Sequence, residues 1–312
     1  MGRMKSEPIR AARGVYAAVA TPRVADSIEV DPAALFDYVD AIARAGIDGI
    51  VLFGSTGEFV HFELADRMRV ATLAIKRCRV PLLVNVSHST LAGALDLADC
   101  ATEAGAAGLL LMPPYFFRYE EEQILAFYSE FASVIDDHMK LYLYNIPQFT
   151  NPISASLATR LLATGRFAGI KDSSGDWQMF EALQALHSRL TFQLLVGNDS
   201  LYMRAFPAGA DGVVSGVAGA VPELMVSLDR SLQVSDAATA GRLNTRLSEF
   251  INWAERFPAT LAIKRAACLR GWKLDHASIP LGPDTRAALG QFECWFREWL
   301  PVVLSESAAM RA

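Results

Sequence analysis

The stretch Ala45-Gly46-Ile47-Asp48-Gly49-Ile50 joins the end of a helical pattern to an aliphatic run, and the same pattern recurs twice along the chain. Residues 104–109 and 208–213 repeat its order of small residue, glycine and aliphatic residues. Each first glycine suits the left-handed conformation that ends many helices, and each aliphatic run suits a strand buried on both faces. Three copies of one helix-to-strand joint predict repeated αβ units.

Eight short aliphatic runs supply the strands of this repeat, and helical patterns lie between them. The first helical pattern begins at Asp31, which can cap the free amide groups, and Pro32, which suits the first helical position. Eight alternating strands and helices predict an α/β fold, a (β/α)8 TIM barrel. An open doubly wound sheet is the alternative, but no Gly-x-Gly-x-x-Gly follows the first strand. The predicted strands are residues 14–22, 47–53, 81–86, 109–112, 140–145, 167–171, 192–197 and 212–215.

The chain divides into three predicted parts. Residues 1–12 form a flexible N-terminal tail, residues 13–222 form the catalytic (β/α)8 barrel, and residues 223–312 form a C-terminal α-helical extension. Helices are predicted there over residues 236–256, 259–271 and 284–300, because strand patterns stop near residue 222. The last helix has an aromatic face typical of core packing, made of Leu289, Phe292, Phe296 and Trp299.

Composition narrows the class of protein. A chain of 312 residues that is 52% hydrophobic can bury a large core, and its net charge of -5 indicates neither nucleic acid nor membrane as a partner. Its four cysteines form no Cys-x-x-Cys pair, which is typical of reduced thiols. We see no secretory signal and no apolar run near the roughly 20 residues that span a bilayer, so we predict a cytoplasmic location.

Lys171 stands where an apolar strand opens into polar residues. A lysine there loses hydration, which favours its neutral amine, and a neutral amine can attack a ketone to form a Schiff base. Taken alone, the stretch is explained more simply by a lysine that marks the exit of the strand to solvent. In a TIM barrel, however, the carboxyl ends of all strands meet at one mouth, so the other strand ends decide between these interpretations.

Two further strand ends carry residues that could assist a Schiff-base lysine. The loop Gly54-Ser55-Thr56-Gly57-Glu58 offers two hydroxyls and backbone amides, including that of Gly57, which can hold a carboxylate. An ordinary helix cap is the alternative for this loop. Tyr144 could act as a general acid and base, although a barrel-filling aromatic is the alternative there.

Four motifs together resemble a known family. In order along the chain they are the loop at residues 54–58, Tyr144-Asn145-Ile146-Pro147, Ile170-Lys171-Asp172-Ser173-Ser174, and Gly209-Ala210-Asp211-Gly212-Val213-Val214-Ser215. This set resembles the dihydrodipicolinate synthase / N-acetylneuraminate lyase family of class I aldolases. The resemblance spans residues 14 to about 300. It implies a TIM barrel with a helical tail, a homotetramer built as a dimer of dimers, and no metal or organic cofactor.

The resemblance also implies roles for individual residues. Lys171 matches the lysine that forms the Schiff base, and Tyr144 matches the tyrosine that shuttles protons. Ser55 and Thr56 match the hydroxyls that bind the carboxylate of the 2-oxo acid, and Ser55 joins Tyr144 in proton transfer. Val214 lies where a backbone group lines the pyruvate end of the site. We therefore expect a lyase that makes or breaks a carbon–carbon bond of a 2-oxo acid, with pyruvate and an aldehyde as small-molecule partners.

Two positions depart from the synthases of this family. Phe149 stands where they have an arginine that grips the carboxylate of the aldehyde, and losing such a charged hydrogen bond costs about 1.5–3 kcal/mol. Phe116 stands where they lend a second tyrosine across the dimer, with Tyr115 as the other possible match. The substrate is thus expected to be a 2-keto-3-deoxy sugar acid or N-acetylneuraminate-like acid. Its distal part could contact His88 or Asp199. A structural role is the alternative for both residues, and for Asp199 that role would be to cap the following helix.

Other functions stay open at this point. Within the family, the alternatives are 4-hydroxy-tetrahydrodipicolinate synthase and a dehydratase. A sugar-phosphate enzyme would use residues 212–216 as a phosphate grip. A metal-dependent aldolase is disfavoured because the five histidines are not paired at ligand spacing. A non-catalytic barrel that binds 2-oxo acids is the last alternative.

Overall fold

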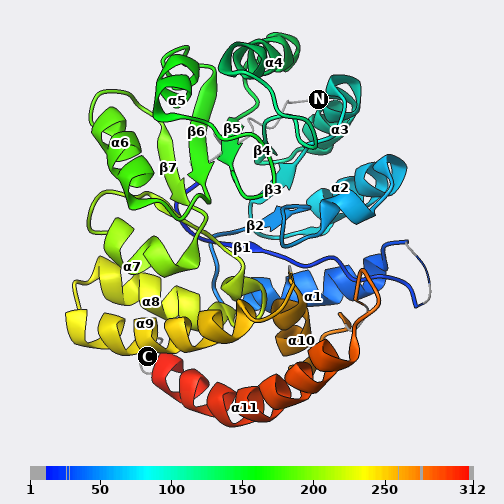
Figure 1. Cartoon of the computed structure of the whole chain (residues 1–312), viewed down its shortest axis with the longest axis vertical. Coiled ribbons are helices and arrows are strands. Elements are labelled where there is room, and N and C mark those ends of the chain that lie inside the picture. Colours follow the sequence, from blue (N-terminus) through cyan, green and yellow to red (C-terminus); the bar gives the residue numbers. More distant parts are fainter. Residues whose placement is uncertain (1–11, 26, 28, 259, 275–276, 309–312) are drawn as a thin grey trace, which may run out of the picture.

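The computed structural model describes residues 12–25, 27, 29–258, 260–274 and 277–308. Within these residues, eight parallel strands pair in chain order and close into a barrel, with β8 beside β1 (Figure 1). The predicted (β/α)8 barrel is confirmed. The strands are β1 (Gly14–Ala18), β2 (Gly49–Leu52), β3 (Leu82–Asn85), β4 (Gly108–Leu111), β5 (Leu141–Asn145), β6 (Phe167–Asp172), β7 (Gln193–Val196) and β8 (Gly212–Ser215).

Helices surround the barrel and continue beyond it on one side (Figure 1). Those that follow strands are α1 (Pro32–Arg44), α2 (Leu64–Arg77), α3 (Leu91–Ala104), α4 (Glu121–Val134), α5 (Ala155–Leu162), α6 (Trp177–His187), α7 (Tyr202–Ala205) and α8 (Pro222–Gln233). The last three are α9 (Ala237–Ala254), α10 (Leu261–Leu269) and α11 (Pro283–Ala308).

Local sequence explains these elements. The carboxylate of Asp31 accepts a hydrogen bond from the Ala34 amide at 3.0 Å, so it caps α1 as predicted, and Pro32 is the first helical residue. The strands are buried almost throughout, as expected for a parallel sheet covered by helices. Their carboxyl ends all open at one end of the barrel, which positions the candidate residues.

Two predicted boundaries were wrong. Strand β1 ends at Ala18 rather than at residue 22, and Thr21 instead donates a hydrogen bond to the Gly57 carbonyl at 2.8 Å. Helix α11 runs through Pro301 to Ala308, although proline removes one helical hydrogen bond. Burial of Val303 and a bond from the Ser227 hydroxyl to the Ser307 carbonyl hold the last turns in place.

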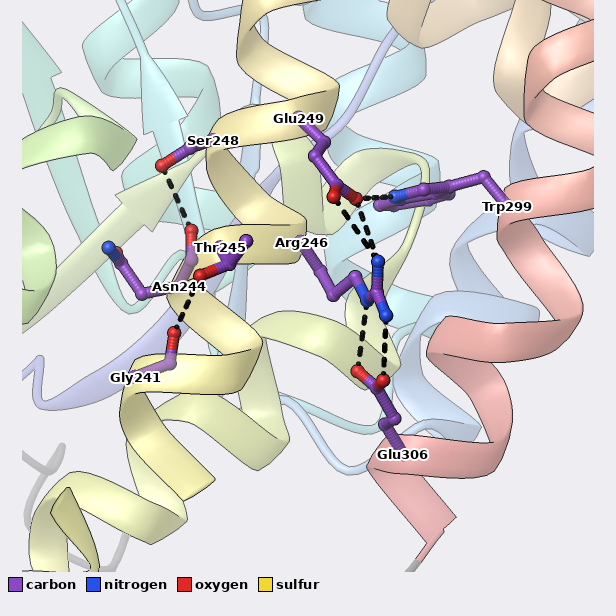
Figure 2. Close-up of polar contacts among 8 residues, drawn as sticks. All are labelled: Gly241, Asn244, Thr245, Arg246, Ser248, Glu249, Trp299 and Glu306. Carbon is purple, nitrogen blue, oxygen red and sulfur yellow. Dashed lines mark hydrogen bonds and ion pairs between the residues drawn. The ribbon is translucent and has the colours of Figure 1, made fainter. Parts of the chain in front are cut away.

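The C-terminal helices are tied together by a polar cluster between α9 and α11 (Figure 2). Arg246 donates two hydrogen bonds to Glu306, at 2.9 and 3.1 Å, and also contacts Glu249. Trp299 donates its indole N–H to Glu249 at 2.8 Å. The aromatic face predicted for residues 284–300 is buried against α9, so it forms core.

The division into barrel and extension remains a prediction. Residue 222 begins α8, which packs against both β1 and α9 and so joins the two predicted parts. The predicted flexible tail lies outside the described residues except for Ala12, whose side chain is buried.

Candidate active site

Lys171 and Tyr144 are neighbours in the barrel wall. They are paired in register on β6 and β5, and both side chains are almost completely buried, with 3% and 0% exposed. The Nζ atom of Lys171 lies 3.8 Å from the centroid of the Tyr144 ring. The structure therefore brings the amine and the phenol together at the mouth, as the sequence predicted.

The loop after β2 completes this group. The hydroxyl of Ser55 lies 3.0 Å from the Tyr144 hydroxyl, within hydrogen-bonding distance. The loop is bracketed by Phe53 and Glu58, which have φ angles of +56° and +53° although neither is glycine. Such left-handed residues are costly and are found where the surroundings impose the conformation, often at functional sites. A Cβ atom at Gly57 would lie 2.9 Å from the Phe53 backbone, so the turn requires glycine there.

The electrostatic environment changes the acidity of Tyr144. Burial is the largest influence and by itself raises the pKa of the phenol. The charge of Lys171 and the hydrogen bond with Ser55 outweigh burial, so the pKa of Tyr144 lies below its ordinary value of 10.0. A phenol that gives up its proton more readily, beside an amine, is suited to proton transfer.

Gly216 lies where three side chains meet, those of Thr56, Asp199 and Ile263, the last of which belongs to α10. A Cβ atom placed there would lie 3.4 Å from the Thr56 hydroxyl, 3.9 Å from Asp199 Oδ2 and 3.2 Å from Ile263 Cδ1. The site thus combines the ends of β2, β7 and β8 with a side chain from α10. Ile263 was not among the predicted site residues, since helical spacing says nothing about which strand end a later helix covers.

Asp199 has an unusual environment at this mouth. Its Oδ2 accepts a hydrogen bond from the Val217 amide at 3.2 Å, while its Oδ1 is buried without a hydrogen-bond partner among the described residues. Burial raises the pKa of this carboxyl, and hydrogen bonds from Ser215 and Val217 and the charge of Lys171 oppose the rise. A buried acceptor without a partner in the protein is rare.

Gly197 makes room for the lysine. A Cβ atom there would fall 2.8 Å from Lys171 Cε and 2.0 Å from the Ser173 hydroxyl. The sequence placed Gly197 at a strand end but gave no sign of this close approach.

The space outside these residues has two openings. The first, of about 270 Å³, is lined mostly by apolar side chains such as Phe250 and Ile263, with polar groups from Ser55, Gln148 and Asp199 among them. A more apolar one of about 290 Å³ is bordered by Ser55, Phe59, Met112, Tyr115 and Phe149. Phe149 borders both openings with 66% of its surface exposed.

Two other candidate residues lie apart from this group. The His88 ring packs against Gly93, and its Nδ1 accepts a hydrogen bond from the Thr90 amide at 3.1 Å at the start of α3. These contacts favour a structural role for His88 beside Thr90, whose hydroxyl caps α3. Val214 is a buried residue of β8, and its predicted role through the backbone remains a prediction.

The aromatic pair at residues 115 and 116 points in two directions. Tyr115 packs edge-on against Phe59 of the same chain, at 5.8 Å between ring centroids. Phe116 has a φ angle of +80° and is 89% exposed, so it projects away from its own barrel. The geometry therefore favours Phe116 over Tyr115 as the residue at the outward-projecting position.

Over the described ranges, no group of three or more His, Cys, Asp or Glu side chains is arranged to hold a metal ion. In the same part of the chain, no helix has the length and apolar character needed to cross a membrane. The predictions of a cofactor-free enzyme and of a cytoplasmic location remain predictions.

A closed parallel barrel with a buried lysine beside a tyrosine at its mouth is the architecture expected of aldolase-type lyases. The chain belongs to the Dihydrodipicolinate synthetase family, whose sequence pattern matches residues 11–295. It is 29% identical over 273 residues to a 4-hydroxy-tetrahydrodipicolinate synthase of Methanococcoides burtonii, covering 86% of this chain and 92% of that protein. The chain is therefore a class I aldolase-type lyase.

Solved structures share the fold. The crystal structure of YagE, a prophage protein of the dihydrodipicolinic acid synthase family from E. coli K12 in complex with pyruvate, aligns with a TM-score of 0.85 and 24% identity. That alignment covers 92% of this chain and 98% of YagE. CdNal from Clostridium difficile, solved with mannosamine, aligns with a TM-score of 0.85 and 17% identity, covering 93% of this chain and 100% of CdNal. At these identities the likeness shows the fold alone.

Proposed function

We propose that the protein cleaves or forms a carbon–carbon bond of a 2-oxo acid through a Schiff base on Lys171. The observation that carries this proposal is the contact of three groups from separate elements: the Lys171 amine, the Tyr144 phenol and the Ser55 hydroxyl. In the proposal, Ser55, Thr56 and the Gly57 amide bind the carboxylate of the substrate.

The proposed cleavage needs only Lys171, Tyr144, Ser55 and water. The Lys171 nitrogen attacks the carbonyl carbon of the 2-oxo acid, water leaves, and a protonated imine forms. The imine accepts electrons, so the bond between the third and fourth carbons can break when a base removes the proton of the fourth-carbon hydroxyl. The Tyr144 phenolate is that base in the proposal, with Ser55 relaying the proton. An aldehyde leaves, and the remaining enamine takes a proton and is hydrolysed to pyruvate.

The polar groups along the first opening favour a hydroxylated substrate tail. The buried Oδ1 of Asp199 has no partner among the described residues, and a substrate hydroxyl would satisfy it. Gln148 and Asn198 border the same opening and can bond further hydroxyls. We therefore favour a 2-keto-3-deoxy sugar acid or N-acetylneuraminate-like acid as the substrate.

The synthase alternative is supported by the relatives that are named 4-hydroxy-tetrahydrodipicolinate synthase. Against it, Phe149 stands at the rim where a guanidinium would be needed for a second carboxylate, and a phenyl ring offers no such bond. A family dehydratase and a non-catalytic barrel remain alternatives for the assay below. For the sugar-phosphate alternative, Gly212–Ser215 form strand β8 between β1 and β7 rather than a loop.

We also infer a homotetramer built as a dimer of dimers. Beside the mouth, Phe116, Phe117 and Phe149 expose 64–89% of their surfaces, and exposed aromatic groups are typical of interfaces. Light scattering coupled to gel filtration tests this inference, and a monomer at micromolar concentration would contradict it.

The test of the function is a panel of 2-keto-3-deoxy sugar acids and N-acetylneuraminate, assayed for pyruvate release. We expect release from at least one member, and none with Lys171→Met as the matched control. Condensation of pyruvate with aspartate semialdehyde, run in parallel, should be slow. Ligand binding without turnover on any 2-oxo acid would contradict the proposal and support the non-catalytic alternative.

A further inference from the structure

A buried ion pair connects the candidate carboxylate-binding loop to the C-terminal helices. The Nζ atom of Lys264 on α10 lies 2.9 Å from Glu58 Oε2, and the two side chains are 4% and 8% exposed. Glu58 is the last residue of the loop that presents Ser55 and Thr56, and Lys264 follows it by 206 residues. The loop is therefore gripped from outside the strands of the barrel.

The conformation of this loop needs such support. Phe53 and Glu58 both have positive φ angles, and strained residues persist only where several contacts impose them. Thr21 holds the loop through the Gly57 carbonyl, and Lys264 holds its end through the Glu58 side chain. Burial raises the pKa of Glu58, but the charge and hydrogen bond of Lys264, with smaller contributions from Ser278 and Thr260, lower it overall, so the carboxylate is charged at neutral pH.

Helix α10 also reaches the site directly. Ile263, the neighbour of Lys264, borders the first opening and approaches Gly216 beside Thr56. Two consecutive residues of one helix thus contact the mouth, one by packing and one through an ion pair.

We propose that Lys264 is a positioning residue, which holds Glu58 so that the Ser55 and Thr56 hydroxyls face the substrate carboxylate. This inference rests on the proposed function, in which those hydroxyls bind a 2-oxo acid. Lys264 has a second effect in the same proposal: it neutralises Glu58. Without Lys264, the buried charge of Glu58 would lack its cation in the same loop that is proposed to bind the substrate carboxylate.

A purely structural ion pair would behave differently. Losing it would lower the stability of the protein and the fraction of active molecules, but each folded molecule would bind pyruvate normally. Losing a positioning residue shifts the affinity for pyruvate itself. The readout is therefore the pyruvate concentration that gives half-maximal borohydride trapping, measured on folded protein together with the maximal extent of trapping.

Lys264→Met is the test variant, and Arg265→Met is its matched control. Arg265 is the next residue of α10 and forms an ion pair with Glu293 of α11 at 2.6 Å, away from the loop. We expect Lys264→Met to raise the half-maximal pyruvate concentration at least tenfold, with a smaller loss in maximal trapping. Arg265→Met should leave the half-maximal concentration within twofold of the wild type.

The double variant Glu58→Gln/Lys264→Met covers the case in which Lys264→Met does not fold, because it leaves neither charge uncompensated. We expect a severalfold rise in the half-maximal concentration from loss of the grip alone. A folded Lys264→Met or double variant with wild-type half-saturation would overturn this inference while the proposed function stands. A wild-type protein that traps no pyruvate would overturn the proposed function and this inference with it.

Discussion

Lys171 and Lys264 are two lysines buried to the same extent, each 3% exposed, but their neighbours differ. Lys264 is paired with the Glu58 carboxylate at 2.9 Å. Lys171 lies 3.8 Å from the centre of the Tyr144 ring, and within the described residues no carboxylate forms an ion pair with it. Lys264 is held by its carboxylate partner, whereas Lys171 faces a phenol at the mouth of the barrel, where it could attack the carbonyl of a substrate. The neighbouring groups, and not burial, separate the lysine proposed to position a loop from the lysine proposed to react.

The largest expected effect is the loss of activity in Lys171→Met. Since no other group in the proposal can form the imine, pyruvate release should fall by at least about 10⁴-fold. Steady-state assays measure the fall, and circular dichroism checks that the variant is folded. Substantial activity in the folded variant would show that the amine at 171 is not the nucleophile.

The next effect concerns the neighbour of that amine. Tyr144→Phe keeps the ring beside Lys171 but removes the hydroxyl bonded to Ser55. We expect kcat to fall by about 10²–10⁴-fold, the usual contribution of general acid–base catalysis, with a smaller change in KM. An unchanged kcat would remove Tyr144 from the proton relay.

The free energy of unfolding should depend more on Lys264 than on Lys171, whereas activity should depend more on Lys171. Lys264→Met leaves the Glu58 charge buried and uncompensated, so we expect a loss of roughly 3–5 kcal/mol in unfolding free energy. Lys171→Met removes a buried amine that has no carboxylate partner, and stability should be unchanged or higher. Urea unfolding of both variants at one pH measures this difference. Equal losses would contradict the distinction drawn between the two sites.

The smallest effect involves Asp199, whose pKa is raised above its ordinary value of 3.8. A carboxyl whose pKa is higher in the folded than in the unfolded protein stabilises the fold at pH values below its unfolded pKa. This stabilisation is lost as the pH rises through the folded pKa. The amide in Asp199→Asn does not ionise, so this variant does not lose stability in this way. Its melting temperature relative to that of the wild type should therefore increase between pH 4 and pH 8. A melting-temperature difference that is constant across this range would contradict the raised pKa.

Much of this arrangement could be predicted from the sequence. The three helix-to-strand joints indicated the barrel, and parallel strands bring their carboxyl ends to one mouth whatever the details of packing. Lys171, Tyr144 and Ser55 could therefore be grouped before any coordinates. Asp199 could be placed at the mouth by the same reasoning, but its unpaired oxygen could not be foreseen.

Other features depend on packing that no local pattern encodes. The choice between Tyr115 and Phe116 could not be made from the sequence, because neither the positive φ angle of Phe116 nor its 89% exposure follows from the local pattern. The continuation of α11 past Pro301 depends on tertiary burial, which overrides the local tendency of proline to end helices. The Glu58–Lys264 pair links residues 206 apart, and the only local sign is a lysine among apolar residues of α10.

The most direct measurement of the central claim is borohydride reduction of the wild-type protein in the presence of pyruvate, followed by peptide mass spectrometry. Among the described residues, this experiment compares the two buried lysines with the exposed Lys76 and Lys273 and the half-buried Lys140. The account predicts one reduced pyruvyl group on Lys171 and none on Lys264. No adduct, or an adduct on another lysine with Lys171 unmodified, would contradict it.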